Sequence, residues 1–279
     1  MALASQSLEF ARFEVLVVND GAKHDLSLLV SRATERGLQL RVLDVPQGGP
    51  GRARNRGASE ALGALLVFTD DDCVPEPGWL AAYAAAGAGE SGALLGGSVF
   101  NLLPHRAGSE ASQVLVDFLY AHYNRDPRDA RFFTSNNIAA SREIFLDYGG
   151  FDPTFLLNAG EDRDLCARWR ERGGRLVHVP GARLGHAHDL TVTRFWKQHF
   201  RYGKGAATYW QARRRQNQAG LTVEPPRFYW DLMRYPLQHR RFPGSIVSLL
   251  LIGLSQVANA LGFFVAARQV PNFADAPRS

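Results

Sequence analysis

The stretch "ALLVFTDDDCVPEPGW", residues 64–79, decides both the fold and the candidate site. Its apolar first half is typical of a buried strand, and three consecutive carboxylates, Asp70, Asp71 and Asp72, follow directly. In an extended segment the side chains at positions i and i+2 point to the same side, so Asp70 and Asp72 can converge on one hard divalent cation. The simpler alternative is an acidic turn that caps the following helix.

Short apolar runs alternate with helical segments along most of the chain. Strands are predicted at residues 13–18, 38–45, 64–69, 94–100 and 175–179. Helices are predicted at residues 25–36, 55–62, 75–87, 108–123, 160–174 and 191–215. This alternation predicts an α/β fold with right-handed crossovers. Ligands of such sheets lie beyond the carboxyl ends of the strands, so Asp20 and the acidic triplet are expected to line one crevice.

The charge and composition of the chain indicate which classes of partner to expect. The net charge is +5, and arginine supplies nearly all of the positive charge, since only Lys23, Lys197 and Lys204 are lysines. Arginine suits diphosphates and anionic membrane surfaces, although codon bias in a GC-rich genome explains the excess equally well. No basic face interleaved with aromatic residues is found, so nucleic acid is not an expected partner. Cys73 and Cys166 lack zinc spacing, which indicates a reducing compartment.

The last part of the chain has a different composition. Residues 216–244 contain several prolines and are predicted to form a linker, and residues 268–279 form a tail. Residues 245–267 carry no charge and are long enough to cross a bilayer, for which about 20 residues suffice. They are expected to form a membrane-associated or transmembrane helix, or else a buried helix packed on the domain. The start of the chain lacks the pattern of a signal peptide.

A phosphatase is one alternative for the acidic triplet. "VFTDDDCV" also fits the D-x-D-x-V nucleophile motif of haloacid-dehalogenase-like phosphatases, in which the first aspartate attacks phosphorus. Those enzymes also need a lysine downstream, and none occurs between Lys23 and Lys197. Their motif also belongs on the first strand of the chain. Both observations disfavour a phosphatase.

The order of several motifs resembles the inverting family 2 glycosyltransferases. The motifs are "VLVVNDGA", "GPGRARNRGASEALGALLVFTDDDCVPEPGW", "FTSNNIAASREIFLDYGGFD", "GEDRDLCARWRERGGRLVHVP", "HAH" and "QHFRYGKG", and they cover roughly residues 3–205. The resemblance implies a doubly wound, mostly parallel sheet of the nucleotide-diphospho-sugar transferase type over residues 1–215. It also implies Mg²⁺ or Mn²⁺ as cofactor, a nucleotide-diphosphate sugar as donor, and a glycan or lipid-linked acceptor. The expected setting is bacterial cell-envelope or polysaccharide synthesis at the cytoplasmic face of the cell membrane.

The resemblance assigns donor and metal residues by position. Asp20 matches the aspartate that contacts the nucleotide base, although it also suits the turn before Gly21. The family's "ARN" motif matches Arg54 and Asn55, which are expected beside the nucleotide diphosphate. The triplet matches the family's D-x-D motif: Asp72 binds the metal, Asp70 lies near the metal and the ribose, and Asp71 sits at the variable position of the donor site.

The resemblance also assigns the base and the metal-binding histidine. Asp162 matches the aspartate of the family's E-D pair, the general base that takes the acceptor proton, and Glu161 is the second choice. The alternative is two acids placed for the helix dipole, which would lower the pKa of the aspartate. His186, in preference to His188, matches a metal-binding histidine in a loop after a strand.

Four residues are assigned to the acceptor or the diphosphate. Gln198, Arg201 and Tyr202 form Q-x-x-R-Y, which is close to the Q-x-x-R-W motif of processive members. Asn137 is placed in the same group. Gln198, Arg201 and Tyr202 could instead belong to an ordinary basic helix face. Because tyrosine replaces the tryptophan of the processive motif, the motif does not establish that the enzyme is processive.

One departure from the family pattern concerns the first strand. The family begins with a strand and turn of the form V-x-V-V-I-P-x-Y-N, and the chain as given aligns only from the end of the following helix. We expect either a misassigned start or a truncated copy. A central strand would then be missing, which leaves two strand edges unpaired. The alternative function is therefore an inactive remnant that binds a membrane or a partner.

Overall fold

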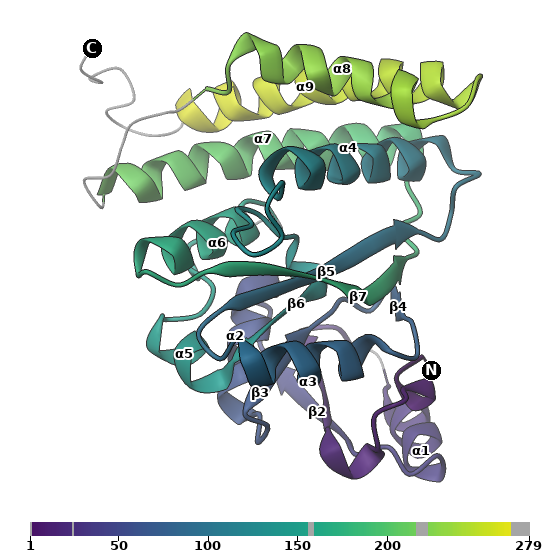
Figure 1. Ribbon diagram of the computed structural model, residues 1–279, viewed down its shortest axis with the longest axis vertical. Helices are drawn as coiled ribbons and strands as arrows, with labels where there is room; N and C mark the ends of the chain where they lie inside the picture. Colours follow the sequence, from purple (N-terminus) through teal and green to yellow (C-terminus); the bar gives the residue numbers. More distant parts are fainter. Residues whose placement is uncertain (1, 24, 156–158, 216–222, 269–279) are drawn as a thin grey trace. The chain divides into compact units, whose positions relative to one another are not determined.

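The computed structural model describes residues 2–23, 25–155, 159–215 and 223–268, which form two compact units (Figure 1). The first unit comprises the described parts of residues 1–102, 120–156 and 161–187. The second comprises those of residues 103–119, 157–160 and 188–279. The predicted catalytic domain, residues 1–215, is therefore divided, because residues 103–119 and 188–215 cluster with the C-terminal helices.

The first unit holds two sheets. Strands β1 (Val15–Asp20) and β2 (Leu40–Val45) pair in parallel and form a sheet of their own. The second sheet has the order β3 (Leu65–Phe68), β6 (Ile138–Ser141), β5 (Leu94–Asn101), β7 (Leu176–His186) and β4 (Cys73–Pro75).

The directions of the strands correct one expectation. In the five-stranded sheet only β5 and β7 run in parallel, and the other three pairings are antiparallel. The expectation of a mostly parallel sheet is wrong, because β6 enters between β3 and β5 with reversed direction after the turn Ser135–Asn137. Among the described residues, β1 has a strand partner only on the β2 side and β3 only on the β6 side.

Most helices of the first unit lie close to the ranges predicted above. The helices of this unit are α1 (Ser27–Glu35), α2 (Pro50–Glu60), α3 (Trp79–Gly89), α5 (Arg142–Asp147) and α6 (Glu161–Glu171), with single turns at Ala2–Ser5 and Phe10–Arg12. Helix α2 begins earlier than predicted. Gly49 adopts a positive φ of 88° and Pro50 follows at the first helical position, where its missing N–H group costs nothing. Arg54 therefore lies inside the helix.

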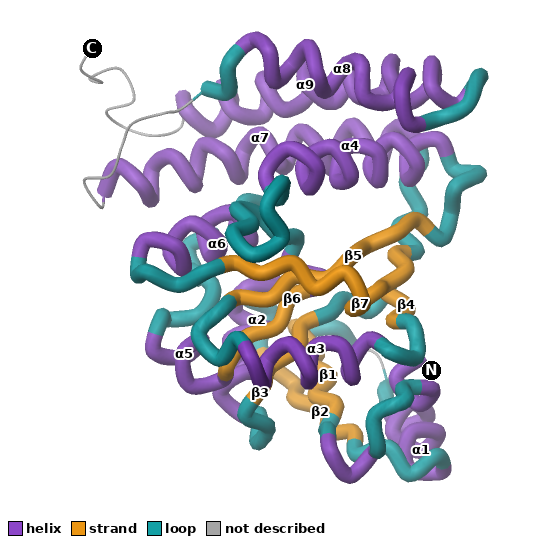
Figure 2. The backbone as a smooth tube through the Cα atoms, in the orientation of Figure 1, coloured by secondary structure: helices purple, strands orange, loops and turns teal. Residues whose placement is uncertain are grey.

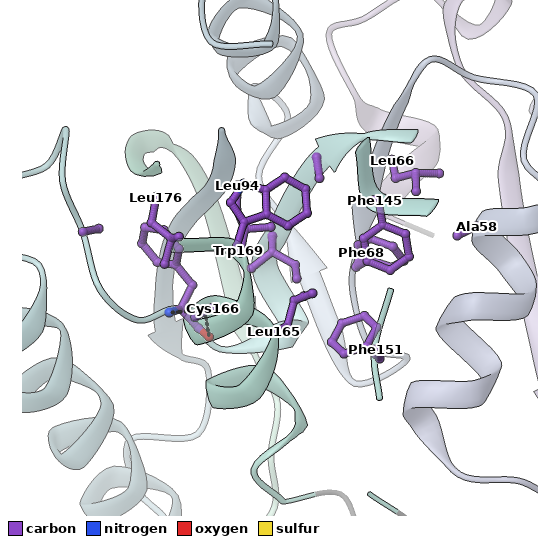
Figure 3. Packing of buried hydrophobic residues seen from close by; sticks show 14 residues of the cluster. Ala58, Leu66, Phe68, Leu94, Phe145, Phe151, Leu165, Cys166, Trp169 and Leu176 are labelled. Carbon is purple, nitrogen blue, oxygen red and sulfur yellow. Dashed lines mark hydrogen bonds between the residues drawn. The ribbon is translucent and has the colours of Figure 1, made fainter. Parts of the chain in front are cut away.

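The five-stranded sheet has a hydrophobic core on each face. Leu94 and Leu95 are consecutive on β5, and they belong to different clusters because strand side chains alternate between faces. Phe68, Phe145 and Trp169 belong to the cluster shown in Figure 3. The other cluster forms against α3 and includes the buried rings of Trp79 and Tyr83.

The second unit is helical. Helices α4 (Ala107–Tyr123, of which residues 120–123 cluster with the first unit) and α7 (Val192–Arg215) form one layer, and α8 (Pro226–His239) and α9 (Gly244–Arg268) lie along them as another (Figure 2). The linker prediction is wrong for residues 226–239, because Pro226 occupies the first turn of α8, where a proline favours a helix. The remaining linker residues 216–222 and the tail 269–279 lie outside the described residues. The predicted apolar helix corresponds to α9.

Candidate functional site

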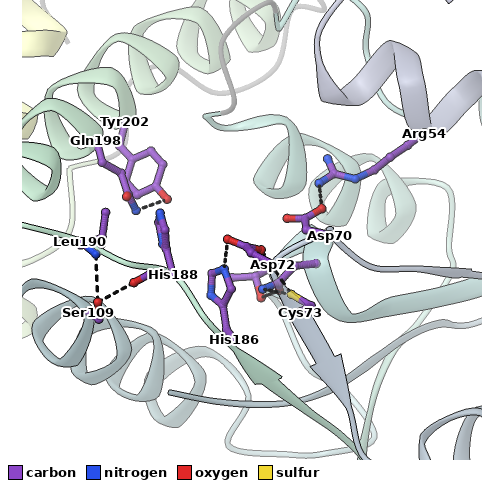
Figure 4. Close-up of polar contacts among 12 residues, drawn as sticks. Arg54, Asp70, Asp72, Cys73, Ser109, His186, His188, Leu190, Gln198 and Tyr202 are labelled. Atoms are coloured by element: carbon purple, nitrogen blue, oxygen red, sulfur yellow. Dashed lines mark hydrogen bonds and ion pairs between the residues drawn. The ribbon is translucent and has the colours of Figure 1, made fainter. Parts of the chain in front are cut away.

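Two of the predicted metal-binding residues meet at the end of β7. Strand β4 pairs with β7 so that Cys73 lies opposite His186, and Asp72 immediately precedes β4. The Asp72 Oδ2 atom is 3.2 Å from His186 Nε2 (Figure 4). Strand β7 extends past its predicted end, so His186 is the last residue of a strand rather than a loop residue. A rigid strand pair thus positions both side chains.

Asp72, Cys73 and His186 make a donor cluster that fits a metal ion. One ligand atom from each residue lies within 4.8 Å of the others. Carboxylate oxygen and imidazole nitrogen both suit Mn²⁺, and carboxylate oxygen suits Mg²⁺. Burial raises the pKa of the Cys73 thiol to about 12, so without a bound cation this thiol stays protonated and is the weakest donor of the three. The sequence indicated Asp72 and His186 but gave no reason to include Cys73.

Asp70 lies outside that cluster. Its Oδ1 atom is 2.6 Å from Arg54 Nη2, and Arg54 Nη1 is 3.5 Å from Oε1 of Glu161. Arg54 and Glu161 have side chains only 9% and 3% exposed, and the guanidinium lies over the Phe151 ring. One cation therefore bridges two carboxylates that come from the end of β3 and the start of α6. The prediction that Asp70 binds the metal is not met in this arrangement, because Asp70 faces Arg54 instead.

The two acids at the start of α6, Glu161 and Asp162, both have raised pKa values. Burial raises the pKa of Glu161 to about 7, and the charge of Asp162 acts in the same direction while Arg54 opposes it. Burial also raises the pKa of Asp162, against the hydrogen bond that its Oδ1 accepts from the Arg163 N–H. The expected lowering by the helix dipole is therefore wrong, because desolvation outweighs it. A raised pKa suits a group that accepts a proton near neutral pH.

Two predicted donor-site residues have other partners in the structure, and a third is exposed. Asp20 accepts hydrogen bonds from the N–H groups of Gly48 and Gly49, at 2.7 and 2.8 Å, and so holds the loop before α2. Asn55 both donates to and accepts from the backbone of Phe151, at 2.7 and 2.8 Å. Asp71 is exposed in the turn. Their contacts with a nucleotide stay predictions, and the first two also stabilise the loops beside Arg54.

Asn137 is a structural residue. Its side chain is fully buried, accepts hydrogen bonds from Trp79 Nε1 and Tyr83 Oη, and donates to the carbonyls of Ser98 and Ala182. Those four bonds saturate the amide. The prediction that Asn137 contacts the acceptor or the diphosphate is wrong, because no donor or acceptor remains for a ligand.

The Q-x-x-R-Y residues lie on α7 in the second unit. Gln198 Nε2 donates to Tyr202 Oη at 2.7 Å, one helical turn away. Gln198 and Arg201 line an open cavity of about 620 Å³, together with Arg194, Lys197 and other residues of 188–200. Sequence reasoning missed Arg194 and Lys197, although both fall at helical spacing on the face of Arg201. The cavity is cationic and partly aromatic.

Comparison with known proteins identifies the family. The model of the family "Glycosyl transferase family 2" matches residues 2–149, more than half of the chain. Glycosyltransferase AglE of Haloferax volcanii is 26% identical over 217 residues, which are 75% of this chain and 67% of that protein. The pre-mycofactocin glycosyltransferase of Mycobacterium tuberculosis is 28% identical over 60% of this chain, which spans only 36% of that protein.

Solved structures show the same fold. A mannosyltransferase of Pyrobaculum calidifontis, in complex with GDP-Man and Mn²⁺, has a TM-score of 0.58 at 17% identity. The match covers 97% of this chain and 75% of the mannosyltransferase chain. GalNAc-T7 with UDP, GalNAc and Mn²⁺ has a TM-score of 0.55 at 15% identity. That match covers 92% of this chain and 51% of the GalNAc-T7 chain. The expected nucleotide-diphospho-sugar transferase fold is thus confirmed, with a mixed sheet. The chain belongs to glycosyl transferase family 2.

Proposed function

We propose that this chain transfers a sugar from a nucleotide-diphosphate sugar to an acceptor hydroxyl, with inversion at the anomeric carbon. The observation that carries the proposal is the pairing of Asp72 with His186 at 3.2 Å, at the carboxyl end of β7. Family membership supports sugar transfer, and the GDP-Man, UDP and UDP-GlcNAc complexes of proteins with this fold support a nucleotide-sugar donor.

Asp72 and His186 would hold the divalent cation, with the Cys73 thiol beside them. When bound, the cation supplies positive charge that stabilises the diphosphate leaving group. The imidazole favours Mn²⁺ over Mg²⁺ in this donor set. The complexes of two proteins with the same fold contain Mn²⁺, which supports the same choice.

Asp162 is the proposed general base. It removes the proton from the acceptor hydroxyl as that oxygen attacks the anomeric carbon, and the sugar–phosphate bond breaks on the opposite side. Its raised pKa increases its affinity for that proton. The Arg54 bridge between Asp70 and Glu161 fixes the start of α6, so Asp162 emerges from an anchored turn.

The acceptor side is less constrained. Gln198 and Arg201 are proposed to contact a glycan or lipid-linked acceptor, supported by the cationic cavity that both residues line. We also propose that the protein acts at the cytoplasmic face of a bacterial membrane, in cell-envelope or polysaccharide synthesis. The apolar helix α9 supports a location at the membrane.

The test is release of nucleotide diphosphate from a panel of UDP- and GDP-sugars, with Mn²⁺ and with Mg²⁺. We expect release with at least one donor and a loss of roughly a hundredfold or more in Asp162→Asn. Glu143→Gln is the matched control, because Glu143 is also an acid in the first turn of a helix. Absence of release with every donor and both metals would contradict the proposal and favour the alternative of an inactive protein.

A further inference from the structure

Helix α9 is mostly apolar and carries no charge before Arg268, but its two faces differ in side-chain size. The buried residues are mostly small: Ser245, Ser248, Leu251, Ile252, Ser255, Ala258, Gly262 and Ala267. The exposed face, here called the outward face, is formed by Ile246, Val247, Leu250, Val257, Leu261, Phe264 and Val265. Leu250 and Phe264 are 67% and 61% exposed. A soluble helix normally buries its large side chains, so this arrangement indicates an apolar environment on the outward side.

Small residues allow α9 to lie very close to α7. A Cβ atom on Gly203 would collide with the backbone of Asn259, and one on Gly262 would collide with the carbonyl of Phe200. Small residues at these positions let the two helix backbones approach closely. Helix α9 is thus fixed to α7 over several turns.

Helix α7 cannot accompany α9 into the hydrocarbon core. It contains no acidic residue, and Lys197, Arg201 and Lys204 lie within or next to the segment that contacts α9. Each cation at the bilayer centre would disfavour insertion roughly a hundredfold. Although α9 is the one described helix long and apolar enough to cross a membrane, its partner helix disfavours that orientation.

The borders of the outward face indicate what covers it. Arg241 and Arg268 are exposed at the two ends of α9, and Arg234 is exposed on α8 beside the Trp230 ring. Residues 232–268 contain no acidic residue, and Asp231, which precedes them, is paired with Arg227. Trp230 is 63% exposed on α8, which packs on α9. Aromatic and arginine side chains beside an apolar surface suit the headgroup region of a bilayer. A second copy of the chain would bring arginines near arginines, whereas anionic lipid supplies the opposite charge.

We propose that the outward face of α9, together with the exposed side of α8, binds the surface of an anionic phospholipid membrane, with α9 parallel to the membrane plane. The interaction combines burial of the large apolar side chains with attraction between the bordering arginines and lipid phosphates. It does not depend on the proposed sugar transfer, because none of these residues belongs to the candidate site of the first unit.

Binding is tested by flotation of the full chain with two kinds of vesicle: phosphatidylcholine alone, and equal parts phosphatidylcholine and phosphatidylglycerol. We expect flotation with the anionic vesicles, reduced by salt. Leu250→Asp combined with Leu261→Asp should weaken it by roughly tenfold for each leucine removed. Leu62→Asp is the matched control, since Leu62 is an exposed leucine of the first unit and should leave flotation unchanged. Arg234→Gln with Arg241→Gln should weaken binding to the anionic vesicles by several-fold per arginine.

Orientation is tested with single cysteines at the two ends of α9. In sealed membrane vesicles from expressing cells, Arg241→Cys and Arg268→Cys should react with an impermeant maleimide from the same side, and alkaline carbonate should release the protein. Cys73 and Cys166 of the unmodified chain give the background labelling. Labelling from opposite sides, with resistance to carbonate, would show that α9 spans the membrane and would overturn the proposal.

Two further results would overturn it. One is equal flotation of the double-aspartate variant and the unmodified chain, with circular dichroism confirming that both are folded. The other is a chain that binds neither kind of vesicle but dimerises in solution, with the double-aspartate variant monomeric. That result would assign the outward face to a second copy. If the chain released no nucleotide diphosphate in the transfer assay, the outcome of the flotation and labelling experiments would not change, so the two proposals can fail separately.

Discussion

The two ends of the acidic triplet lie in opposite environments. Asp70 is paired with Arg54, which also reaches Glu161, so this end is an ionic bridge with a buried guanidinium at its centre. Asp72 lies beside His186 and Cys73, all three half-buried, so this end is a cluster of donors without a lysine or arginine among its members. Two identical side chains, two residues apart, thus acquire different chemistry from the strands and helices that flank them.

The difference has a functional consequence. A carboxylate that faces a guanidinium already has its counter-charge, whereas one that faces an imidazole and a thiol forms an oxygen, nitrogen and sulfur donor set. The ionic bridge therefore positions the start of α6, and the donor cluster is the candidate metal site.

The largest effect is expected from removing the bridging cation. Arg54→Ala leaves Asp70 and the buried Glu161 without their counter-charge, and the free energy of unfolding should fall by about 3 kcal/mol. Arg56→Ala is the control on the same helix, because Arg56 makes an exposed pair with Glu60 whose loss should cost about 0.5 kcal/mol or less. Urea unfolding measures both. Equal losses in the two variants would show that the buried bridge does not hold the fold.

The next effect concerns the donor cluster. His186→Asn removes the imidazole beside Asp72 and should weaken Mn²⁺ binding roughly tenfold to a hundredfold, measured by calorimetry on the full chain. His188→Asn, two residues along, should leave the affinity unchanged. If His188→Asn is the variant that loses Mn²⁺, the cluster is misassigned.

The smallest effect is a pH dependence of stability. The pKa of Glu161 is about 7 in the folded chain and near 4.5 when unperturbed, so between these pH values the folded chain keeps a proton that the unfolded chain has released. The free energy of unfolding should therefore fall as the pH rises through this window. Glu161→Gln should flatten the slope, and Glu143→Gln, an exposed acid of α5, should retain it. Unfolding curves at a series of pH values decide the point.

The sequence was sufficient where a residue's role depends on local structure. The triplet follows a strand, Glu161 and Asp162 begin a helix, and the positions of most helices and strands follow from apolar spacing. Strand direction could not be predicted from the sequence, since the apolar pattern of β6 is the same in either direction. The antiparallel entry of β6 therefore appears only in the structure.

Hydrogen-bond and ion-pair partners that are distant in the sequence could not be predicted either. Asn137 is saturated by Trp79, Tyr83 and two carbonyls, and the nearest of these partners is 39 residues away. Packing of α3 against the sheet buries this side chain, which its neighbours in the sequence do not reveal. The bridge from Arg54 to Glu161 likewise depends on α2 and α6 meeting at the end of β3.

The division of the triplet is tested most directly by the Mn²⁺ affinity of Asp72→Asn and Asp70→Asn, measured side by side by calorimetry, with the exposed Asp71→Asn as control. We expect Asp72→Asn to lose Mn²⁺ binding by roughly a hundredfold or more, while Asp70→Asn and Asp71→Asn retain it within about threefold. Equal loss of Mn²⁺ in Asp70→Asn and Asp72→Asn would contradict this division.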